Sequence, residues 1–444
     1  MRSSFADDDL VLCVLTYLPD FQCLASTILT SKSVYNIFQQ HPRSIIRSVA
    51  YNLVGPALPQ ALRFVRCRNA QQYSKPVGEL LGEDNIQRNP VLSSEEITGL
   101  VAISSSIQEL ECVFSRRMKD RRYATSQLSS AESTRFQRAM YRLCLFSIVY
   151  GLTAYKSAPE ANSNIILAVR EARKLRKGFF GNFPTPELRE IQRVGEFLRG
   201  ILARTNARPP LDDPEPSHIS TLTSSMIYHA PDTALKVYEG VYDWIHDLYN
   251  IAIPFFEDFI TEPLVSVLLD RNEPRLLPVG HKHLILDEVI GEHDRCSQCQ
   301  SDSVQGLDLW GPNNWRYHWS MRGTRVLLIV NSLKGNLSRN HAYEGHFSSV
   351  VERAPTEQLI AGLFECKIPA YDTWNKEDWL CRQCLETFIH DHLHVWYLNQ
   401  KVKGGHLIPD NCFYGYNCTT QAEKYVHAKE LNHLCEPTKG YDNL

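Results

Sequence analysis

Two pairs of cysteines in this chain have the spacing of zinc ligands. In each pair two residues separate the cysteines, and the pairs are Cys296 with Cys299 and Cys381 with Cys384. Two thiolates three positions apart on a tight turn can both reach one Zn²⁺ at about 2.3 Å, and two such turns complete a tetrahedron. Because the pairs lie far apart in the sequence, this site would clamp two distant segments. The alternative interpretation is four small buried thiols without a metal.

A second group of metal-binding side chains lies close to residue 444. Its members are two cysteines and two histidines: Cys412, Cys418, His427 and His433. Two thiolates and two imidazoles on one short segment suit one structural zinc ion, and Gly415 permits a sharp turn between the cysteines. On an ideal helix the two histidines would point about 120° apart, so a helix here must bend or end between them. The sequence leaves open whether Cys366 or Cys435 replaces one of the chosen ligands, and whether the cysteines are simply core residues.

The segment that carries these residues has an unusual composition. From His281 to Leu444 the chain holds 8 of its 13 Cys, 12 of its 16 His and 6 of its 7 Trp. This enrichment indicates a separate domain, which we place at residues 288–444 and predict to be small and of α+β type. A strand is predicted from Thr324 to Val330. One amphipathic helix is predicted after Cys384, with an apolar stripe of Phe388, Ile389, Leu393, Trp396 and Tyr397.

Residues 46–287 are predicted to form a helical scaffold. Ser129 and Glu132 make a capping box ahead of an apolar run, and Pro186 stands at the first position of another helical segment. The segment 209–216 is rich in proline and aspartate and is predicted to be a loop. A further helix is predicted after Asp232, with the apolar positions Val237, Val241, Trp244, Ile245 and Leu248.

Three short amphipathic helices are predicted within residues 1–45. Asp7 to Asp9 favour the start of the first helix, Pro19 and Asp20 end it, and Ser31 can cap the third. The main apolar positions of this unit are Leu10, Leu15, Leu18, Leu24, Tyr35 and Phe38. So small a unit buries its apolar surface poorly. It must therefore pack either on a partner or on the residues that follow it.

The segment from Asp7 to Gln40 resembles an F-box, the three-helix module that docks a substrate receptor onto the adaptor subunit of a cullin-RING ubiquitin ligase. The six apolar residues above stand at apolar positions of that motif. The stretches HPRSIIRSVAYNLVGPALPQALRFVRC and ESTRFQRAMYRLCLF resemble the body of a large group of uncharacterised fungal F-box-like proteins. The resemblance implies a substrate-recognition adaptor. Its partners would be the ligase adaptor subunit, through these six residues, and a protein substrate that the sequence does not identify.

The segment Cys412-Phe-Tyr-Gly-Tyr-Asn-Cys418, with the two histidines beyond it, resembles the poly(ADP-ribose)-binding zinc finger. In that family an aromatic and a basic residue directly after the second cysteine contact the ligand, and here those positions hold Thr419 and Thr420. Tyr414 and Tyr416 offer faces for stacking, and nearby lysines could meet phosphates. The alternative function is therefore a zinc-dependent binder of nucleic acid or poly(ADP-ribose) without a ligase role.

Composition and charge narrow the class of protein. The chain has 444 residues, of which 43% are hydrophobic and 22% charged, which is typical of a folded protein of two to three domains. The formal net charge of -3 calls for no nucleic-acid or membrane partner. The first residues lack a basic region, and no apolar run approaches the ~18 residues that span a bilayer. We therefore expect a cytoplasmic or nuclear protein with reduced cysteines.

Enzyme signatures are absent from the sequence. It contains no P-loop, no G-x-S-x-G and no H-E-x-x-H motif, which favours a non-enzymatic protein, with a hydrolase that has an open zinc position as the third option. The basic clusters at 116–122 and 170–177 are interpreted as solvated helix faces. His390, His392 and His394 are interpreted as solvent-facing or core histidines.

The predicted fold class is mainly α. It comprises an N-terminal F-box-like three-helix module at residues 1–45, a helical scaffold at 46–287 and a small α+β C-terminal domain at 288–444, stabilised by one or two structural zinc ions.

Overall fold

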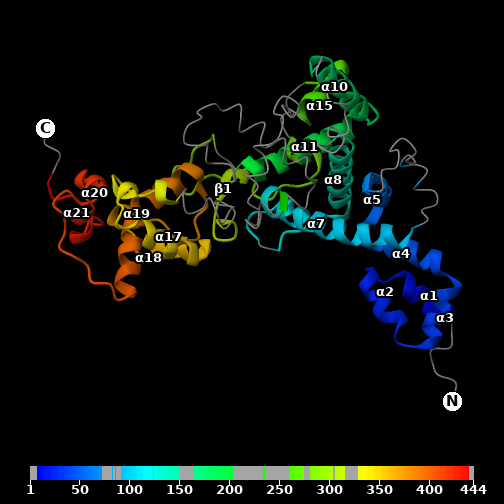
Figure 1. Cartoon of the computed structure of the whole chain (residues 1–444), viewed down its shortest axis with the longest axis horizontal. Helices are drawn as coiled ribbons and strands as arrows, with labels where there is room; N and C mark the ends of the chain where they lie inside the picture. The colour runs from blue at the N-terminus through cyan, green and yellow to red at the C-terminus, as the bar shows by residue number, and fades with distance from the viewer. Residues whose placement is uncertain are drawn as a thin grey trace.

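The computed structural model describes residues 8–72, 83, 86, 92–123, 125–150, 165–203, 234–235, 260–274, 281–303, 306–315 and 329–439. Within these ranges the chain is mainly helical, with fifteen α-helices and one sheet of two short strands (Figure 1). The prediction of a mainly α fold is confirmed. The predicted helix with Val237, Val241, Trp244, Ile245 and Leu248 lies outside the described residues, and so does the proline-rich loop at 209–216.

Three short helices open the described chain: α1 (Asp8–Thr16), α2 (Phe21–Ile28) and α3 (Lys32–Gln40). The Asp20 carboxylate accepts a hydrogen bond from the backbone N–H of Cys23 at 2.7 Å and caps α2, and the Ser31 hydroxyl caps α3. Ile45 and Val49 of α4 (Pro42–Val54) complete the apolar core of these helices. The three N-terminal helices thus share one apolar core with α4.

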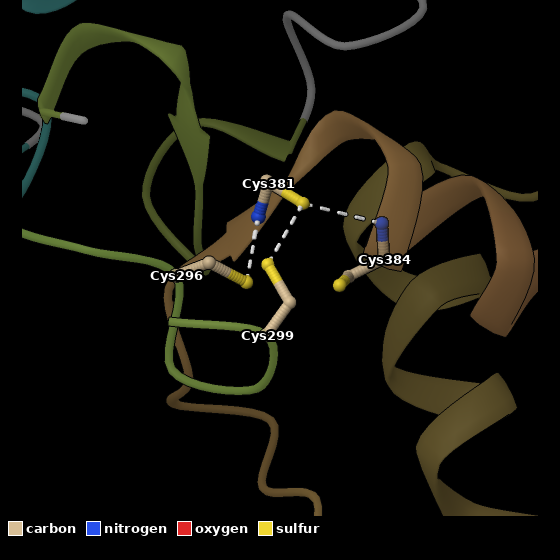
Figure 2. Close-up of side chains that lie close together, drawn as sticks. All are labelled: Cys296, Cys299, Cys381 and Cys384. Atoms are coloured by element: carbon tan, nitrogen blue, oxygen red, sulfur yellow. Dashed lines mark hydrogen bonds between the residues drawn. The ribbon is translucent and has the colours of Figure 1, made fainter. Parts of the chain in front are cut away.

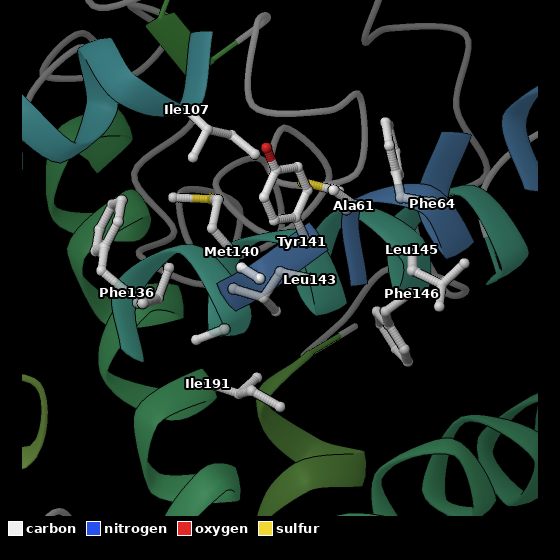
Figure 3. Close-up of a cluster of buried hydrophobic side chains, with 14 of the residues drawn as sticks. Ala61, Phe64, Ile107, Phe136, Met140, Tyr141, Leu143, Leu145, Phe146 and Ile191 are labelled. Carbon is white, nitrogen blue, oxygen red and sulfur yellow. The ribbon is translucent and has the colours of Figure 1, made fainter. Parts of the chain in front are cut away.

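The scaffold is built from α4, η1 (Gly55–Ala57), α5 (Leu58–Gln72), α7 (Ser94–Met118), α8 (Ser130–Tyr150), α10 (Ile165–Gly181), α11 (Thr185–Ala203), α15 (Thr261–Asp270) and η4 (His281–Leu284). The helices α5, α7 and α11 all pack on α8, whose apolar side chains fill the core (Figure 3). Phe114, Phe136 and Phe197 form one aromatic cluster there, with ring centroids 4.9 to 6.1 Å apart.

Helix α7 is long and apolar enough to cross a membrane by length and composition, and it alone among the described helices meets that description. Its side chains Leu100, Ile103, Ile107 and Phe114 are buried against the neighbouring scaffold helices. This packing accounts for the apolar composition of α7 as that of a core helix.

The predicted capping box of α8 is present and has a wider role. The Glu132 carboxylate accepts hydrogen bonds from the backbone N–H groups of Ser129 and Asp287, and it also pairs with Lys119. Burial raises the pKa of Glu132, but the Lys119 ammonium and the two N–H donors outweigh it and lower the pKa below the ordinary value. One carboxylate therefore joins α7, α8 and the segment after η4.

Three arginines of the two basic clusters are buried: Arg117, Arg121 and Arg176. In 116–122, Arg117 and Arg121 are 8% and 7% exposed, and the Arg121 guanidinium lies 4.6 Å from the centre of the Trp310 ring. The prediction of a solvated face is wrong for these two residues, because their side chains are covered by other segments. In 170–177, Arg173 and Lys174 are exposed as predicted, whereas Arg176 is buried.

The C-terminal domain contains α17 (Glu344–Arg353), α18 (Thr356–Glu365), α19 (Arg382–Lys403), α20 (Thr420–Glu423) and α21 (Tyr425–Glu430). Short 3₁₀ turns lie between them: η5 (Gly306–Asp308), η7 (Leu337–Arg339), η8 (Pro369–Tyr371) and η9 (Gly415–Asn417). Its separate apolar core surrounds α19, where Phe364, Phe388 and Trp374 stack. This core is a buried apolar cluster separate from that of the scaffold.

Among the described residues of this domain there is little sheet, in contrast to the predicted α+β class. Strands β1 (Leu309–Trp310) and β2 (Leu380–Cys381) have two residues each and pair antiparallel, with Leu309 opposite Cys381. The strand predicted from Thr324 to Val330 lies outside the described residues except for Ile329 and Val330, which are helical.

The scaffold meets the C-terminal domain through the end of α7. The backbone N–H of Ile290 donates to the carbonyl of Lys119 at 2.8 Å, and the Arg122 guanidinium pairs with the Asp294 carboxylate. The side-chain amide of Asn313 donates to the carbonyl of Arg122. Together with the Arg121 contact on Trp310, these bonds bring the scaffold against the segment that enters the first cysteine turn.

Candidate metal centres

The two C-x2-C pairs meet at one point of the fold (Figure 2). Cys296 and Cys299 lie on a turn before β1, and Cys381 and Cys384 lie where β2 passes into α19. All four Sγ atoms lie within 4.8 Å of one another, and those of Cys299 and Cys381 are 3.8 Å apart. Four thiolates at about 2.3 Å from one Zn²⁺ in a tetrahedron would be about 3.8 Å apart. The geometry of this thiol cluster therefore suits a zinc ion.

Backbone hydrogen bonds hold the two cysteine turns together. The N–H of Ser297 donates to the carbonyl of Trp379 at 2.8 Å, and the N–H of Trp379 donates to the Ser297 hydroxyl at 3.0 Å. The N–H of Cys381 donates to the Cys296 sulfur at 3.2 Å, and the N–H of Cys384 donates to the Cys381 sulfur at 3.4 Å. Such N–H···S bonds favour thiolates, which are the form that binds a metal.

The pKa values of the thiols in this cluster are shifted in different directions. Burial raises the pKa of Cys296, but backbone N–H donors from Cys299 and Cys381 outweigh it and bring the pKa to about 7. Burial and the neighbouring sulfurs raise the pKa of Cys384. Each thiolate that forms in this cluster makes ionisation of its neighbours less favourable, because like charges repel. A bound cation would remove this repulsion and allow all four thiols to ionise.

The second predicted group also converges. The ligand atoms of Cys412, Cys418, His427 and His433 lie within 4.8 Å of one another. The Nε2 atom of His427 is 3.3 Å from the Cys418 sulfur and 3.9 Å from the Cys412 sulfur. A tetrahedral zinc ion would place such pairs about 3.6 Å apart. This Cys/His cluster therefore also suits a zinc ion.

The local fold presents the two histidines as the sequence predicts. Helix α21 contains His427 and ends at Glu430, so His433 approaches the cluster from extended chain. Gly415 has φ +43°, and a Cβ atom at this position would collide with the backbone carbonyl of Cys435. The sharp turn between the two cysteines thus requires glycine.

His433 gives the most direct support for a metal in this cluster. It is fully buried, and neither ring nitrogen has a hydrogen-bond partner among the described residues. Burial, with the nearby His427 ring, lowers the pKa of His433 to about 4, so the ring is neutral at pH 7. A buried neutral imidazole without a partner is costly in a protein interior and is ready to bind a metal.

The alternative ligands stay outside both clusters. Cys366 donates to the carbonyl of Gly362 at 3.2 Å, and burial raises its pKa to about 11. Cys435 lies close to the second cluster, where it donates to the carbonyls of Cys412 and Asn432. Neither cysteine belongs to a set of ligand atoms within 4.8 Å.

The Cys/His cluster also anchors an earlier segment of the chain. The backbone N–H of His433 donates to the Tyr343 hydroxyl, and the Asn340 side-chain amide donates to the Gln421 side-chain oxygen at 2.8 Å. Gln421 in turn donates to the carbonyls of Tyr416 and Cys418. Loss of this cluster would therefore loosen the segment around Asn340 as well as the residues after 410.

The two tyrosines predicted to face a ligand differ in exposure. Tyr414 is 45% exposed, whereas Tyr416 is 9% exposed, with its hydroxyl on the Glu436 carboxylate and Lys334 over its ring. Stacking by Tyr416 is a wrong prediction, because its faces are covered. Sequence reasoning missed Phe413, which is 64% exposed with the Lys439 ammonium 4.9 Å from its ring centre.

The predicted partner-binding residues of the N-terminal helices also differ in exposure. Leu15 and Leu24 are buried in the core, and Leu18 and Phe38 pack against it. Leu10 and Tyr35 are exposed. The prediction of a contact surface is wrong for Leu15 and Leu24, because their side chains hold the three helices together.

The histidines of α19 belong to neither cluster of converging ligand atoms among the described residues. The Nε2 atom of His392 accepts from the N–H of Ile368, and its Nδ1 atom bonds the carbonyl of Phe388. His394 is buried and His390 lies beside the Asp391 carboxylate. Their interpretation as core and solvent-facing residues is supported.

Comparison with protein-family models, curated proteins and solved structures finds no match to this chain. The functional assignment therefore rests on the geometry of the two clusters and on the local resemblances of the sequence.

Proposed function

We propose that each cluster binds one structural zinc ion. The observation that carries this is the convergence of four protein ligands at each site, with separations that match a zinc tetrahedron. Four protein ligands close the coordination sphere, so no position is left for a reactive water. The zinc ions would fix distant segments of the C-terminal domain and would take no part in catalysis.

Metal content of the purified full-length chain tests this proposal. Elemental analysis should find two zinc equivalents per chain, and mild chelation should remove them with loss of near-ultraviolet dichroism from the Trp-rich C-terminal domain. Protein purified without chelator and free of metal would contradict the proposal. A visible charge-transfer spectrum after cobalt exchange would identify the thiolate ligands.

We further propose that the chain is a non-enzymatic adaptor of a cullin-RING ubiquitin ligase. In this proposal helices α1 to α3 bind the ligase adaptor subunit, and the zinc-stabilised domain binds a protein substrate. Support comes from the F-box-like sequence and from apolar side chains that this small module leaves exposed. These are Leu10, Val14, Leu29 and Tyr35, with exposed fractions of 56%, 50%, 82% and 44%.

Capture of the purified ligase adaptor subunit by the full-length chain tests the docking proposal. Leu10→Glu and Leu29→Glu should each weaken capture, because a charge replaces exposed apolar surface without disturbing the buried Leu15 and Leu24. Leu407→Glu is a matched control, since Leu407 is 96% exposed in the C-terminal domain. No capture by the unmodified chain, or equal capture by all variants, would contradict the adaptor role.

The exposed aromatic side chains beside the Cys/His cluster favour a second candidate function. Phe413 and Tyr414 are exposed, and the Lys439 ammonium lies over the Phe413 ring, an arrangement that suits stacking against a base with a cation close by. In this alternative the chain binds nucleic acid or poly(ADP-ribose) without a ligase. Binding of labelled poly(ADP-ribose) or single-stranded RNA should then weaken steeply with salt and fall in Tyr414→Ala. Absence of such binding at low salt would exclude it.

A further inference from the structure

A cleft of about 710 Å³ lies where the N-terminal helices meet the scaffold. One wall is the end of α1, with Thr16 and Tyr17, and the other is a single face of α4. The floor is apolar. Its residues are Pro56, Leu58, Pro59 and Ile86. A cleft of this size lies in the range of ligand sites, which is about 300 to 1,000 Å³.

The α4 face that lines the cleft is polar and follows helical spacing. Its residues are Ser44, Arg47, Ser48, Tyr51 and Asn52. The side chains of Ser44, Arg47 and Tyr51 have no hydrogen-bond or ion-pair partner within the part of the chain that the structure describes. A cation and two hydroxyl groups therefore line one cleft without internal partners among the described residues.

Asn52 has a different role in the cleft. Its side-chain amide donates to the carbonyls of Thr16 and Leu18 at 2.8 Å each. These two bonds cap the end of α1 and tie it to α4. The two walls of the cleft are thus held at a fixed separation, so the site is formed before a ligand arrives.

Arg47 is the one charged residue among those that line the cleft. From Phe21 to Gly78 the sequence contains no Asp or Glu, against seven Lys and Arg. Arg63 and Arg66 of α5 are neutralised by Glu83 and Glu96, whereas Arg47 faces no carboxylate among the residues lining the cleft. The one charge that lines the cleft is therefore positive and favours an anionic group.

We propose that this cleft binds an extended peptide with an anionic side chain, a carboxylate or a phosphate. Arg47 and the hydroxyls of Ser44, Ser48 and Tyr51 would bind the anionic group, because a guanidinium and hydroxyl donors suit its oxygen atoms. The apolar floor and the Tyr17 and Tyr51 rings would contact the flanking residues. The proposal depends on neither the zinc ions nor the ligase role.

Fluorescence anisotropy with the full-length chain tests the proposal. The probes are labelled degenerate nonapeptide libraries whose central residue is phosphoserine, glutamate, serine or lysine. The phosphoserine and glutamate libraries should bind at least about tenfold more tightly than the serine and lysine libraries. The ratio between the first two identifies phosphate or carboxylate as the preferred group.

A pair of charge reversals on α4 provides the control. Arg47→Glu should abolish the preference for anionic libraries, whereas Arg43→Glu should retain it, because Arg43 is exposed on the same helix but does not line the cleft. Thermal unfolding of both variants checks that the fold is kept, and Arg47→Gln gives a neutral second variant. Equal binding of all four libraries would overturn the proposal. Equal loss in both charge-reversed variants would do so too.

Discussion

The sulfur atoms of Cys299 and Cys381 lie 3.8 Å apart although 82 positions separate the two residues in the chain. This is the edge length of a zinc tetrathiolate. The contact forms where the turn before β1 meets the start of α19, so one metal ion would link the entry of the C-terminal domain to its longest helix. Without the metal, the four sulfurs would converge with no cation to compensate the charge of their thiolates.

Replacement of one cysteine of the thiol cluster should remove one metal ion. We expect Cys381→Ser to lower the zinc content from two equivalents to one and to expose the amides of α18 and α19 to hydrogen exchange, while α7 and α8 stay protected. Cys366→Ser is the matched control, because Cys366 is a half-buried thiol of the same domain that lies outside both clusters. Two retained equivalents in Cys381→Ser would disprove the assignment.

The Cys/His cluster gives a separate prediction about its ligands. Cys412→Ser should lose one zinc equivalent and loosen the segment that Tyr343 and Asn340 tie to this cluster. Cys435→Ser should keep both equivalents, because the Cys435 sulfur is engaged with backbone carbonyls instead. If Cys435→Ser loses metal while His433→Ala keeps it, Cys435 and not His433 is the fourth ligand.

The convergence of the eight candidate ligands was predictable because their signal is chemical and local. The C-x2-C pairs and the Cys/His segment each present ligand types at spacings that few other functions require. The pairing of two distant turns followed from the number of ligands that zinc needs. The helical content of 288–444 was harder to predict, since helices as short as α20 and α21 carry too few residues to show a clear apolar period.

Exposure was the least predictable property of individual residues. Leu10 and Leu15 both lie on an amphipathic helix, but only Leu15 is buried in the core, since only one face of α1 packs against the other helices. Arg121 belongs to a basic run that looks solvated, and the Trp310 ring that covers it comes from another domain. Such contacts depend on tertiary packing, which periodicity along one segment does not record.

The core of the N-terminal module provides a test that is independent of any partner. Leu15→Ala should destabilise α1 to α3 by about 3 kcal/mol, because the side chain is fully buried and leaves a cavity. Leu29→Ala should change stability by less than about 0.5 kcal/mol, because Leu29 is 82% exposed. Amide hydrogen exchange of the three helices measures both. Similar protection in the two variants would contradict the assigned core.

The buried Glu132 carboxylate should make scaffold stability depend on pH. Its pKa is lowered in the fold, since Lys119 and two backbone N–H donors outweigh the effect of burial. A carboxylate with a lowered pKa contributes stability above its ordinary pKa, and this contribution is lost as the pH falls through the folded value.

Glu132→Gln should therefore lower the stability of the scaffold by about 2 kcal/mol at pH 7. The difference from the unmodified chain should shrink as the pH falls below the ordinary carboxyl pKa, because the native carboxyl is then protonated as well. Thermal unfolding followed by far-ultraviolet dichroism between pH 7 and pH 3 measures the difference. Glu109→Gln, an exposed change on α7, is the control and should show little difference at any pH. A constant difference across this range would mean that Glu132 acts through packing and not through its charge.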